Sequence, residues 1–479
     1  MKNKKNTLIR GCILAVLVYY IIIICFYYIA GEQLYFRDSK NQIVSANIEY
    51  AVGEITEETM ASQEFMCNMD RLDAYSISFG TYERDNAGTI VVKLFNLTNN
   101  TLVDQKELDV SKLQNCEYAY LKLDRPINNV YGHRFKIEMT SENSMEGNAI
   151  TPMYSASVIM EESGLSYNGK EVKGTLCFNT YGKDNVWTGP RYWKIMISLG
   201  VLLCFFCIVL ILKKKNNKKS ITLNAIEVLK KYKFLIKQLV LRDFKIKYKR
   251  SFLGALWSLI NPLLTMSIQY IIFSTIFKAD IVNYPIYLLS GVILFNFFTE
   301  ATGAAMYAIV GNASLITKVY VPKYIYPVSK IFSSAVNLII AIIPLLVMCI
   351  WTNTKITIAY LLLPFTLICL VTFCIGIGFM LSSLIVFFRD IQFIWGVVSM
   401  AWMYATPIFY PESILPMGFD IVLKINPLFY FIKFFRIAVI NGISPEPILY
   451  LQCMLFALAT LVIGICIFRK TQNKFIFYI

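Results

Sequence analysis

Long apolar segments constrain this chain more than any other feature of its sequence. An α-helix needs about 20 residues, at about 1.5 Å rise each, to cross a bilayer. Only 16% of the 479 residues are charged, whereas soluble proteins have about 25%. The sequence therefore predicts a multi-pass membrane protein. The expected spans are Gly11 to Ala30 and Ile195 to Leu212, followed approximately by Gly254 to Phe277, Pro285 to Val310, Ile331 to Trp351, Ile358 to Phe388, Ile391 to Tyr410 and Ile448 to Phe468.

Basic residues beside these segments predict their orientation, because cytoplasmic loops carry the excess of Lys and Arg. Lys and Arg residues precede the first segment, and a lysine cluster from Lys213 to Lys219 follows the second. Both chain ends are therefore expected in the cytoplasm and residues 31–192 outside it. The first segment is expected to be an uncleaved anchor, with signal cleavage near Ala30 as the alternative. The net charge of +15 fits this topology, and we expect no nucleic-acid partner because no separate basic domain is present.

Residues 31–192 are polar and strand-like. Thr89 to Leu97 is rich in β-branched and aromatic residues, Asn99-Asn100 offers a turn, and Thr101 to Glu107 can return as a hairpin partner. Short strands at similar spacing predict an all-β sandwich. The segment Leu72 to Asn96 resembles jelly-roll modules, some of which bind carbohydrate. Cys67, Cys116 and Cys177 allow at most one disulfide here, and the sequence does not select the pair.

The stretch from Asn224 to Arg250 mixes apolar and basic residues and precedes a membrane segment. This pattern predicts an amphipathic helix along the cytoplasmic surface, with a strand as the alternative on pattern alone. The predicted organisation is a cytoplasmic N-terminus with a first membrane helix (1–30), an extracytoplasmic β-sandwich (31–192), a second membrane helix (193–212), a basic linker with the amphipathic helix (213–253) and a six-helix membrane domain (254–479).

Several kinds of chemistry lack their usual residues. The sequence has no GxxxxGK[ST] loop to bind nucleotide phosphates. Its single histidine, His133, lies in the predicted outer domain, so most metal and general-base sites lack their usual residue. We therefore expect no catalytic residue, no bound metal and no cofactor on this chain.

Six segments carry a family resemblance across roughly the last 250 residues. They are similar, in order and spacing, to ABC-2-type polysaccharide and polyol-phosphate export permeases, the family of O-antigen and teichoic-acid exporters. The segments are Leu241 to Leu264 (LRDFKIKYKRSFLGALWSLINPLL), Tyr284 to Phe298 (YPIYLLSGVILFNFF), Gly311 to Ser329 (GNASLITKVYVPKYIYPVS), Phe387 to Phe393 (FFRDIQF), Thr406 to Pro411 (TPIFYP) and Ile425 to Arg436 (INPLFYFIKFFR).

The resemblance implies a homodimer with two copies of a separate ABC ATPase, which binds ATP and Mg²⁺. The implied cargo is a polyprenyl-pyrophosphate-linked glycan that crosses a bacterial plasma membrane. The implied fold is a six-helix ABC-2 membrane domain, here preceded by two extra helices with the β-sandwich between them. Residues 1 to about 222 lie outside the family pattern.

The resemblance also assigns an ATPase interface on the amphipathic helix and on a cytoplasmic coupling helix within Gly311 to Ser329. A membrane-surface anchor and an ordinary loop are the respective alternatives. The basic residues also suit the pyrophosphate of a lipid carrier. The interface residues are Arg242, Asp243, Lys245, Lys247, Lys318, Tyr320 and Pro322.

A translocation path is expected among the membrane segments. Glu300 is the unexpected residue, since a carboxylate in lipid costs about 2.5–3.5 kcal/mol. It either reaches the interface, which is the favoured explanation, or lines the path or pairs with a basic residue. Aromatic rings suit the apolar faces of sugars, although they also form packing and interfacial belts. The aromatic candidates are Phe295, Phe298, Trp395, Trp402, Tyr404, Phe409 and Tyr410, and helix breaks are expected at Pro262, Pro407 and Pro427.

Two other functions compete with export. A membrane glycosyl- or acyltransferase of surface glycan assembly would need paired carboxylates or a basic histidine on a loop, and no such group stands out. A sensor would place the outer domain between two helices, as here, but would end in a soluble signalling domain rather than in six further apolar segments.

Overall fold

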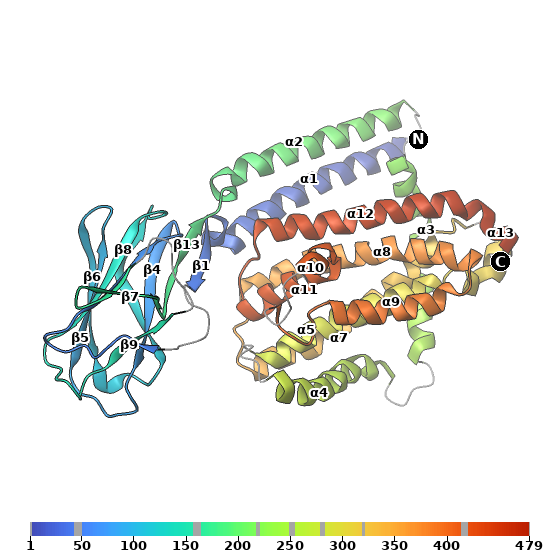
Figure 1. Cartoon of the computed structure of the whole chain (residues 1–479). Coiled ribbons are helices and arrows are strands. Elements are labelled where there is room, and N and C mark those ends of the chain that lie inside the picture. Colours follow the sequence, from blue (N-terminus) through green and yellow to red (C-terminus); the bar gives the residue numbers. More distant parts are fainter. Residues whose placement is uncertain are drawn as a thin grey trace. The chain divides into compact units, whose positions relative to one another are not determined.

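The computed structural model describes residues 2–42, 50–156, 164–216, 221–248, 254–277, 283–318, 321–412 and 420–478. The chain divides into two compact units (Figure 1). One is Leu34–Tyr192, and the other combines Met1–Gln33 with Trp193–Ile479. The first unit is built from β-strands and the second from helices.

The β unit consists of two antiparallel sheets. The larger sheet has seven strands in the order β1-β13-β4-β9-β12, with β2 paired to β9 and β7 paired to β4. Its strands are β1 (Phe36–Gln42), β2 (Tyr50–Ala51), β4 (Arg71–Gly80), β7 (Glu117–Asn128), β9 (Thr151–Ser155), β12 (Thr175–Leu176) and β13 (Phe178–Asn185). The second sheet has six strands in the order β11-β10-β3-β8-β5-β6. They are β3 (Ala61–Met66), β5 (Thr89–Asn96), β6 (Thr101–Asp109), β8 (Arg134–Ser141), β10 (Leu165–Tyr167) and β11 (Lys170–Val172).

The two sheets share one apolar core. Phe65 on β3 stacks on Phe135 of β8 with ring centroids 5.7 Å apart, and Phe178 of the other sheet approaches Phe65 at 5.0 Å. The predicted hairpin is confirmed, because β5 pairs with β6 from Thr89–Asp109 to Asn96–Thr101. Its turn contains Asn100 at φ 52°, a conformation that Asn tolerates better than most residues. The three cysteines of this unit are free thiols; they are Cys67, Cys116 and Cys177.

An antiparallel helix pair begins the helical unit. It consists of α1 (Lys2–Ala30) and α2 (Thr188–Lys215). The hydroxyl of Tyr19 donates a hydrogen bond to the carbonyl of Met196 at 2.7 Å, and Leu8 near the start of α1 packs with Leu210 near the end of α2. Large apolar side chains elsewhere on both helices are exposed, as expected of surfaces that face lipid.

The remaining helices surround a large apolar core. The long ones are α3 (Ile221–Tyr248), α4 (Trp257–Phe277), α5 (Tyr284–Met306), α7 (Ile325–Trp351), α8 (Leu363–Phe387), α9 (Ile391–Ala405) and α12 (Pro447–Thr471). The short ones are α6 (Ala313–Lys318), α10 (Asp420–Ile425), α11 (Pro427–Arg436) and α13 (Phe475–Tyr478), and 3₁₀ or π turns connect several of them.

Six described helical segments are long and apolar enough to cross a membrane. They are Leu8–Leu34, Thr188–Lys215, Tyr284–Met306, Ile325–Trp351, Ile358–Phe387 and Pro447–Tyr478. Two shorter apolar helices are Leu259–Phe273 and Ile391–Ala405.

The structure corrects the span that was predicted from Ile391 to Tyr410. Helix α9 has 15 residues and ends at Ala405, which gives a length of about 22 Å, short of a hydrocarbon core of about 30 Å. Pro407 explains the early end, because proline lacks an N–H and moves the preceding residue out of the helical region. Thr406 is indeed extended, with φ −103° and ψ 130°.

Two glycines bring α8 and α12 into backbone contact. A Cβ atom on Gly376 would lie 2.5 Å from the carbonyl of Thr460, and a Cβ on Gly464 would lie 2.2 Å from the carbonyl oxygen of Gly376. Helices in membranes associate through such small residues, which let backbones approach closely.

Candidate functional site

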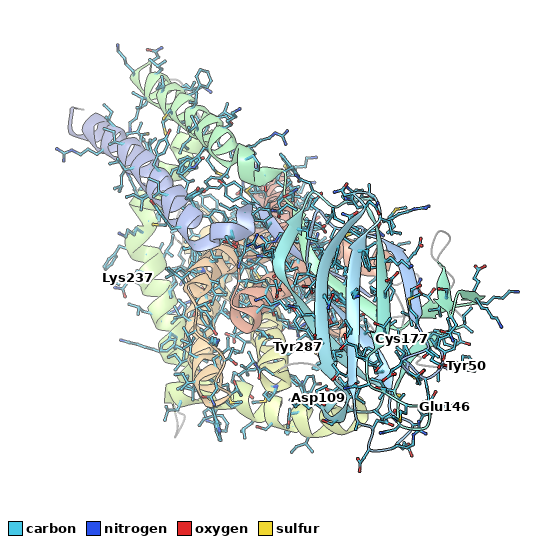
Figure 2. All side chains as sticks on the ribbon, turned by 90° about the vertical axis from the view of Figure 1, so that its left-hand side faces the viewer. Tyr50, Asp109, Glu146, Cys177, Lys237 and Tyr287 are labelled. Atoms are coloured by element: carbon cyan, nitrogen blue, oxygen red, sulfur yellow. The ribbon has the colours of Figure 1, made fainter. Side chains whose placement is uncertain are left out.

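The amphipathic segment is a helix, α3, as predicted in preference to a strand. Leu239 is 5% exposed and belongs to an apolar cluster with Tyr326 of α7 and Phe379 of α8. On the other side of α3, Lys237 is exposed and projects away from the ribbon in Figure 2. The helix therefore packs one face on the membrane core and presents a basic face outward.

Ion pairs join the C-terminal half of α3 to its own chain. The carboxylate of Asp243 lies 3.0 Å from the ammonium of Lys330 on α7 and 3.0 Å from the guanidinium of Arg242. The Asp243 side chain is only 11% exposed, whereas that of Arg242 is 44% exposed. Asp243 thus fixes α3 to α7, and Arg242 remains accessible to a partner.

A second ion pair joins α3 to α5. The ammonium of Lys247 lies 2.9 Å from Oε1 of Glu300. The same oxygen accepts a hydrogen bond from the side-chain amide of Asn337 on α7 at 2.7 Å. Glu300 therefore connects three elements, α3, α5 and α7, through one carboxylate.

The other predicted interface residues differ in placement. Lys245 on α3 and Lys318 at the end of α6 are exposed, and neither forms an ion pair with the described residues. Pro322 is half-buried at the start of the segment that leads into α7. Tyr320 lies outside the described residues.

A cavity of about 320 Å³ lies between the C-terminal end of α3 and helices α4, α5 and α7. We call it the amide cavity. Its polar lining comes from six side chains, which are Lys247, Asn261, Asn296, Glu300, Ser334 and Asn337. Ile293, Phe297 and Leu338 contribute apolar wall. Lys247 and Glu300 were predicted from the sequence as site residues. The other polar lining residues were not, because they come together only when α4, α5 and α7 pack.

The predicted helix break at Pro262 is wrong. Pro262 lies inside α4, which continues from Trp257 to Phe277. It occupies an early turn of that helix, where only one backbone hydrogen bond to the preceding turn is lost. Pro427, by contrast, is the first residue of α11, and Asn426 before it accepts a hydrogen bond from the backbone N–H of Leu428. Pro407 lies in the non-helical segment after α9.

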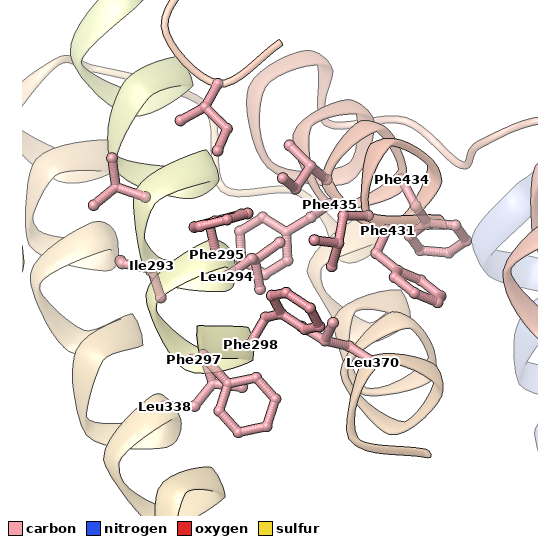
Figure 3. Packing of buried hydrophobic residues seen from close by; sticks show 14 of the residues in the cluster. Ile293, Leu294, Phe295, Phe297, Phe298, Leu338, Leu370, Phe431, Phe434 and Phe435 are labelled. Carbon is pink, nitrogen blue, oxygen red and sulfur yellow. The ribbon is translucent and has the colours of Figure 1, made fainter. Parts of the chain in front are cut away.

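Most of the predicted path aromatics lie in or against the packed core. Phe298 is fully buried, and its ring lies 5.2 Å from Trp402 and 5.9 Å from Trp395. Figure 3 shows Phe295 and Phe298 among the core side chains, near Phe431 and Phe435. The indole N–H of Trp402 donates to Asn426 at 2.7 Å.

The last three path aromatics lie at or after the end of α9. Phe409 is buried, and its ring stacks on that of Phe273 of α4 with centroids 5.1 Å apart. Tyr410 is half-buried, and its hydroxyl donates to the carbonyl of Tyr404 at 2.6 Å. Tyr404 is 58% exposed. Among the predicted path aromatics it presents the most surface outside the packed core.

A buried arginine that sequence analysis did not single out holds this non-helical segment. Arg436, the last residue of α11, donates through Nη1 to the carbonyl of Pro407 at 2.7 Å and through Nη2 to that of Ile408 at 3.0 Å. It also donates to the carbonyl of Tyr287 on α5 at 2.9 Å. Its guanidinium carbon lies 3.4 Å from the centroid of the Tyr287 ring, a cation–π arrangement. The only signal in the sequence was a basic residue at the end of an apolar motif.

Metal chemistry has no candidate among the described residues, since no group of three or more His, Cys, Asp or Glu side chains could hold an ion there.

In the helical unit, a bundle of apolar helices follows the amphipathic helix α3. Residues 235–440 match the family described as ABC-2 type transporter. This match confirms, for the helical core, the resemblance that the sequence motifs carry, and the chain is a multi-pass membrane protein.

The relatives include O-antigen export permeases and a polysialic acid transport protein. The O-antigen export system permease protein RfbA of Klebsiella pneumoniae is 29% identical over 236 residues, covering 49% of this chain and 90% of the relative. RfbA of Myxococcus xanthus is 28% identical over 208 residues, 43% of this chain and 80% of the relative. The polysialic acid transport protein KpsM of Escherichia coli is 25% identical over 249 residues, 50% of this chain and 95% of the relative.

Proposed function

We propose that this chain is the permease subunit of an ABC exporter that moves a lipid-linked polysaccharide from the cytoplasmic to the outer side of a bacterial plasma membrane. The cargo is an O-antigen, teichoic-acid or capsule-like glycan on a polyprenyl pyrophosphate. A separate ATPase subunit binds ATP and Mg²⁺ and supplies the driving force, so the permease itself is not an enzyme. The similarity of 43–49% of the chain to named O-antigen export permeases carries this proposal.

The exposed basic side chains of the amphipathic helix and of α6 support an ATPase interface. Arg242 and Lys245 on α3 and Lys318 on α6 are accessible. Helix α3 is also attached to the membrane core through the ion pairs of Asp243 and Lys247. A movement of the bound ATPase would therefore be transmitted to α5 and α7 through α3.

A second copy of the chain would cover the apolar surface of α9. Among its 15 residues none is buried, and Phe393, Val397 and Tyr404 are each more than half exposed. In the proposed homodimer, Tyr404 and the neighbouring aromatic residues line the glycan path between the two copies.

The N-terminal part adds two transmembrane helices, α1 and α2, and an outer domain. The positive charges that flank these helices support a topology with both chain ends in the cytoplasm and residues 31–192 outside it. In this proposal the outer domain is a jelly-roll-like sandwich, a class that its two antiparallel sheets support, and it packs against a partner or contacts the glycan outside the cell.

Deletion of the gene tests the export function. The deletion strain is expected to lose its surface glycan and to accumulate lipid-linked glycan in the inner leaflet, and the wild-type gene should restore both. Full surface glycan in the deletion strain would refute the proposal. Loss of surface glycan without accumulation of the lipid-linked precursor would instead favour the glycosyl- or acyltransferase alternative.

Co-purification tests the ATPase partner. The chain alone, in nanodiscs, is expected to hydrolyse no ATP, and hydrolysis should appear with the co-expressed ATPase. Lys318→Glu is expected to reduce the co-purified ATPase severalfold. Lys424→Glu is the matched control, since Lys424 is also an exposed lysine but lies in the last turn of α10, remote from α6 in the sequence and expected on the outer side. Equal recovery of the ATPase with both variants would contradict the assigned interface.

A further inference from the structure

We propose that the amide cavity is a binding site for neutral sugar, which takes one or two sugar rings of the cargo in the half of the membrane domain next to the interface helix. The proposal rests on the proposed export function and narrows it, because it names a residue set on this chain that recognises the glycan rather than its lipid carrier.

Unpartnered amides are the first observation. The side chains of Asn261 on α4 and Asn296 on α5 line the cavity, and both are exposed to it without a side-chain hydrogen bond to any described residue. Each amide offers two donors and one acceptor oxygen. Sugar hydroxyls both donate and accept, so pairs of amides match them better than they match an acceptor-only anion.

The charge of the cavity is the second observation. Its only cation among the described lining residues is Lys247, which is already 2.9 Å from Glu300. Phosphate sites in proteins use unpaired Arg or Lys groups or helix N-termini. The ammonium of Lys247, already paired with Glu300, is not such an unpaired cation. A carboxylate and an ammonium side by side in one wall can both form hydrogen bonds with hydroxyl groups.

Size and apolar wall are the third observation. The volume of about 320 Å³ lies at the low end of the range of about 300–1,000 Å³ for small-molecule sites. The space suits one or two rings and excludes a polymer. The side chains of Trp257 and Phe297 lie in the same lining, and aromatic surface is suited to the apolar face of a sugar ring.

The position of Glu300 gives such a site a consequence. Its Oε1 accepts from Lys247 of the interface helix and from Asn337 of α7. A hydroxyl group bound at this oxygen competes with Lys247, so occupation of the cavity changes the link between α3 and α5. Binding of the correct glycan in the cavity thereby changes how α3, the helix that contacts the ATPase, is held to α5.

Ligand-detected saturation-transfer NMR on the full chain in nanodiscs tests the site. The probes are the methyl glycosides of N-acetylglucosamine, galactose, glucose and rhamnose at millimolar concentration, with inorganic pyrophosphate followed by ³¹P line broadening. We expect at least one glycoside to bind the wild type. Asn261→Ala and Asn296→Ala should each raise its Kd roughly fivefold, and the double variant roughly 25-fold, for hydrogen bonds of ordinary strength.

Asn216→Ala is the matched control, because Asn216 is an exposed amide at the end of α2, outside the cavity. It should leave the Kd unchanged. Among the described residues, neither Asn261 nor Asn296 has a side-chain partner to lose, so folding is expected to be intact and is checked by size exclusion.

Three binding results would overturn the assignment: no glycoside binds the wild type, glycoside binding survives the double variant, or pyrophosphate binds and its binding is lost in the same variants. The last result would mark an anion site. Complementation of the deletion strain separates the two proposals. If the wild type restores surface glycan and the double variant restores it equally, the cavity assignment fails and export stands. If deletion never removed the glycan, the export proposal fails whatever the cavity binds.

Discussion

Arg436 shows how one residue can stabilise backbone that has left the helix. Carbonyl groups in the segment after α9 have no helical partners, and an unsatisfied polar group inside a membrane protein costs several kcal/mol. The planar guanidinium donates to the carbonyls of Tyr287, Pro407 and Ile408 together. No carboxylate forms an ion pair with it among the described residues, so its charge is stabilised by these dipoles and by the ring of Tyr287.

Substitution of Arg436 by lysine should therefore release this segment. A lysine keeps the charge but concentrates its donors on one nitrogen, which cannot reach carbonyls from two elements at once. We expect a loss of about 3–5 kcal/mol, the range for a buried charge that loses its partners. Hydrogen exchange of the peptide that spans residues 404–412, measured on the full chain in nanodiscs, should accelerate strongly.

Lys433→Ala provides the control on the same helix. Lys433 forms an exposed ion pair with Glu412 at 2.9 Å, and such pairs contribute about 0–1 kcal/mol. Exchange in Lys433→Ala should stay near the wild-type rate. Wild-type exchange in Arg436→Lys would show that the carbonyls are held by other groups.

Asp104 on β6 is a buried carboxyl group whose burial on folding opposes its ionisation. Its side chain is 3% exposed, and its Oδ2 has no hydrogen-bond partner among the described residues. Burial raises the pKa of Asp104 above its usual value, and the nearby Lys106 only partly offsets this. Lys106 is itself bonded to Asp124. At neutral pH the folded domain therefore holds a poorly solvated carboxylate.

The sign of the pH effect follows from that raised pKa. A group whose folded-state pKa exceeds its unfolded value of about 3.9 stabilises the fold below the unfolded pKa, and this contribution is lost as pH rises through the folded pKa. Asp104→Asn, which mimics the protonated acid, should stabilise the β unit at pH 7 by on the order of 1 kcal/mol. The gain should shrink as the pH approaches 4.

Hydrogen exchange of the β4 and β6 peptides at both pH values measures this gain. Asp109, at the other end of β6 and labelled in Figure 2, is the control. Hydrogen bonds from the hydroxyl and the backbone N–H of Ser111 lower the pKa of Asp109, so Asp109→Asn should not stabilise the domain at pH 7. Slower exchange in both variants would mean that the effect is not specific to the buried carboxylate.

These residues mark the boundary of what could be predicted from the sequence. The turn at Asn99-Asn100 was predictable because its geometry depends on neighbouring residues only. Glu300 was recognised because a carboxylate in an apolar segment is costly wherever it lies. The roles of Arg436 and Asp104 depend on carbonyls and side chains from distant segments, and nothing in the local pattern distinguishes them from surface charges.

At the scale of elements, the crossing of α8 and α12 depends on the absence of side chains. Gly376 lies against the backbone of Thr460 and Leu461, and a backbone cannot move aside as a flexible side chain can. Gly376→Val should therefore separate the helices and destabilise the bundle by about 1–3 kcal/mol or more, as overpacking does. Its thermal unfolding midpoint in detergent, followed by tryptophan fluorescence, should fall.

Gly303→Ala on α5 is the matched control, because a Cβ there would meet no atom within 4 Å. Alanine is the better helix former by about 1 kcal/mol, so this variant should be neutral or slightly more stable. A Gly376→Val protein as stable as the wild type would show that the two helices tolerate a wider spacing.

Among the elements, length and hydropathy predicted the long spans well and the short ones less well. The apolar composition of residues 391–410 is continuous, but the helix ends at Ala405 because Pro407 dominates locally. Pro262 has the same chemistry, yet α4 continues through it. The two prolines differ in position, since Pro262 lies in the first turns of its helix and Pro407 follows fifteen helical residues. Hydropathy alone does not distinguish these two cases.

For the molecule as a whole, the proposed export would require that α3, the proposed ATPase-facing helix, move the membrane core. The described contacts between α3 and the core include two ion pairs, Asp243–Lys330 and Lys247–Glu300. The Lys247–Glu300 pair joins α3 to α5 and lines the amide cavity. The Asp243–Lys330 pair joins α3 to α7 only, and neither of its residues lines the cavity. The two pairs therefore allow mechanical attachment to be separated from coupling to the cavity.

Charge reversal at Lys247 and Glu300 tests that coupling. Both side chains are about 40% exposed (44% and 39%), so the folding cost of either reversal is small. Lys247→Glu alone places two carboxylates together and should lower surface glycan at least severalfold in the complemented deletion strain, with the amount of co-purified ATPase unchanged. The double variant Lys247→Glu, Glu300→Lys restores opposite charges and should recover a substantial part of the export. If the double variant exports no better than Lys247→Glu, the two residues act separately, and α3 transmits its movement to the core through Asp243 and Lys330 instead.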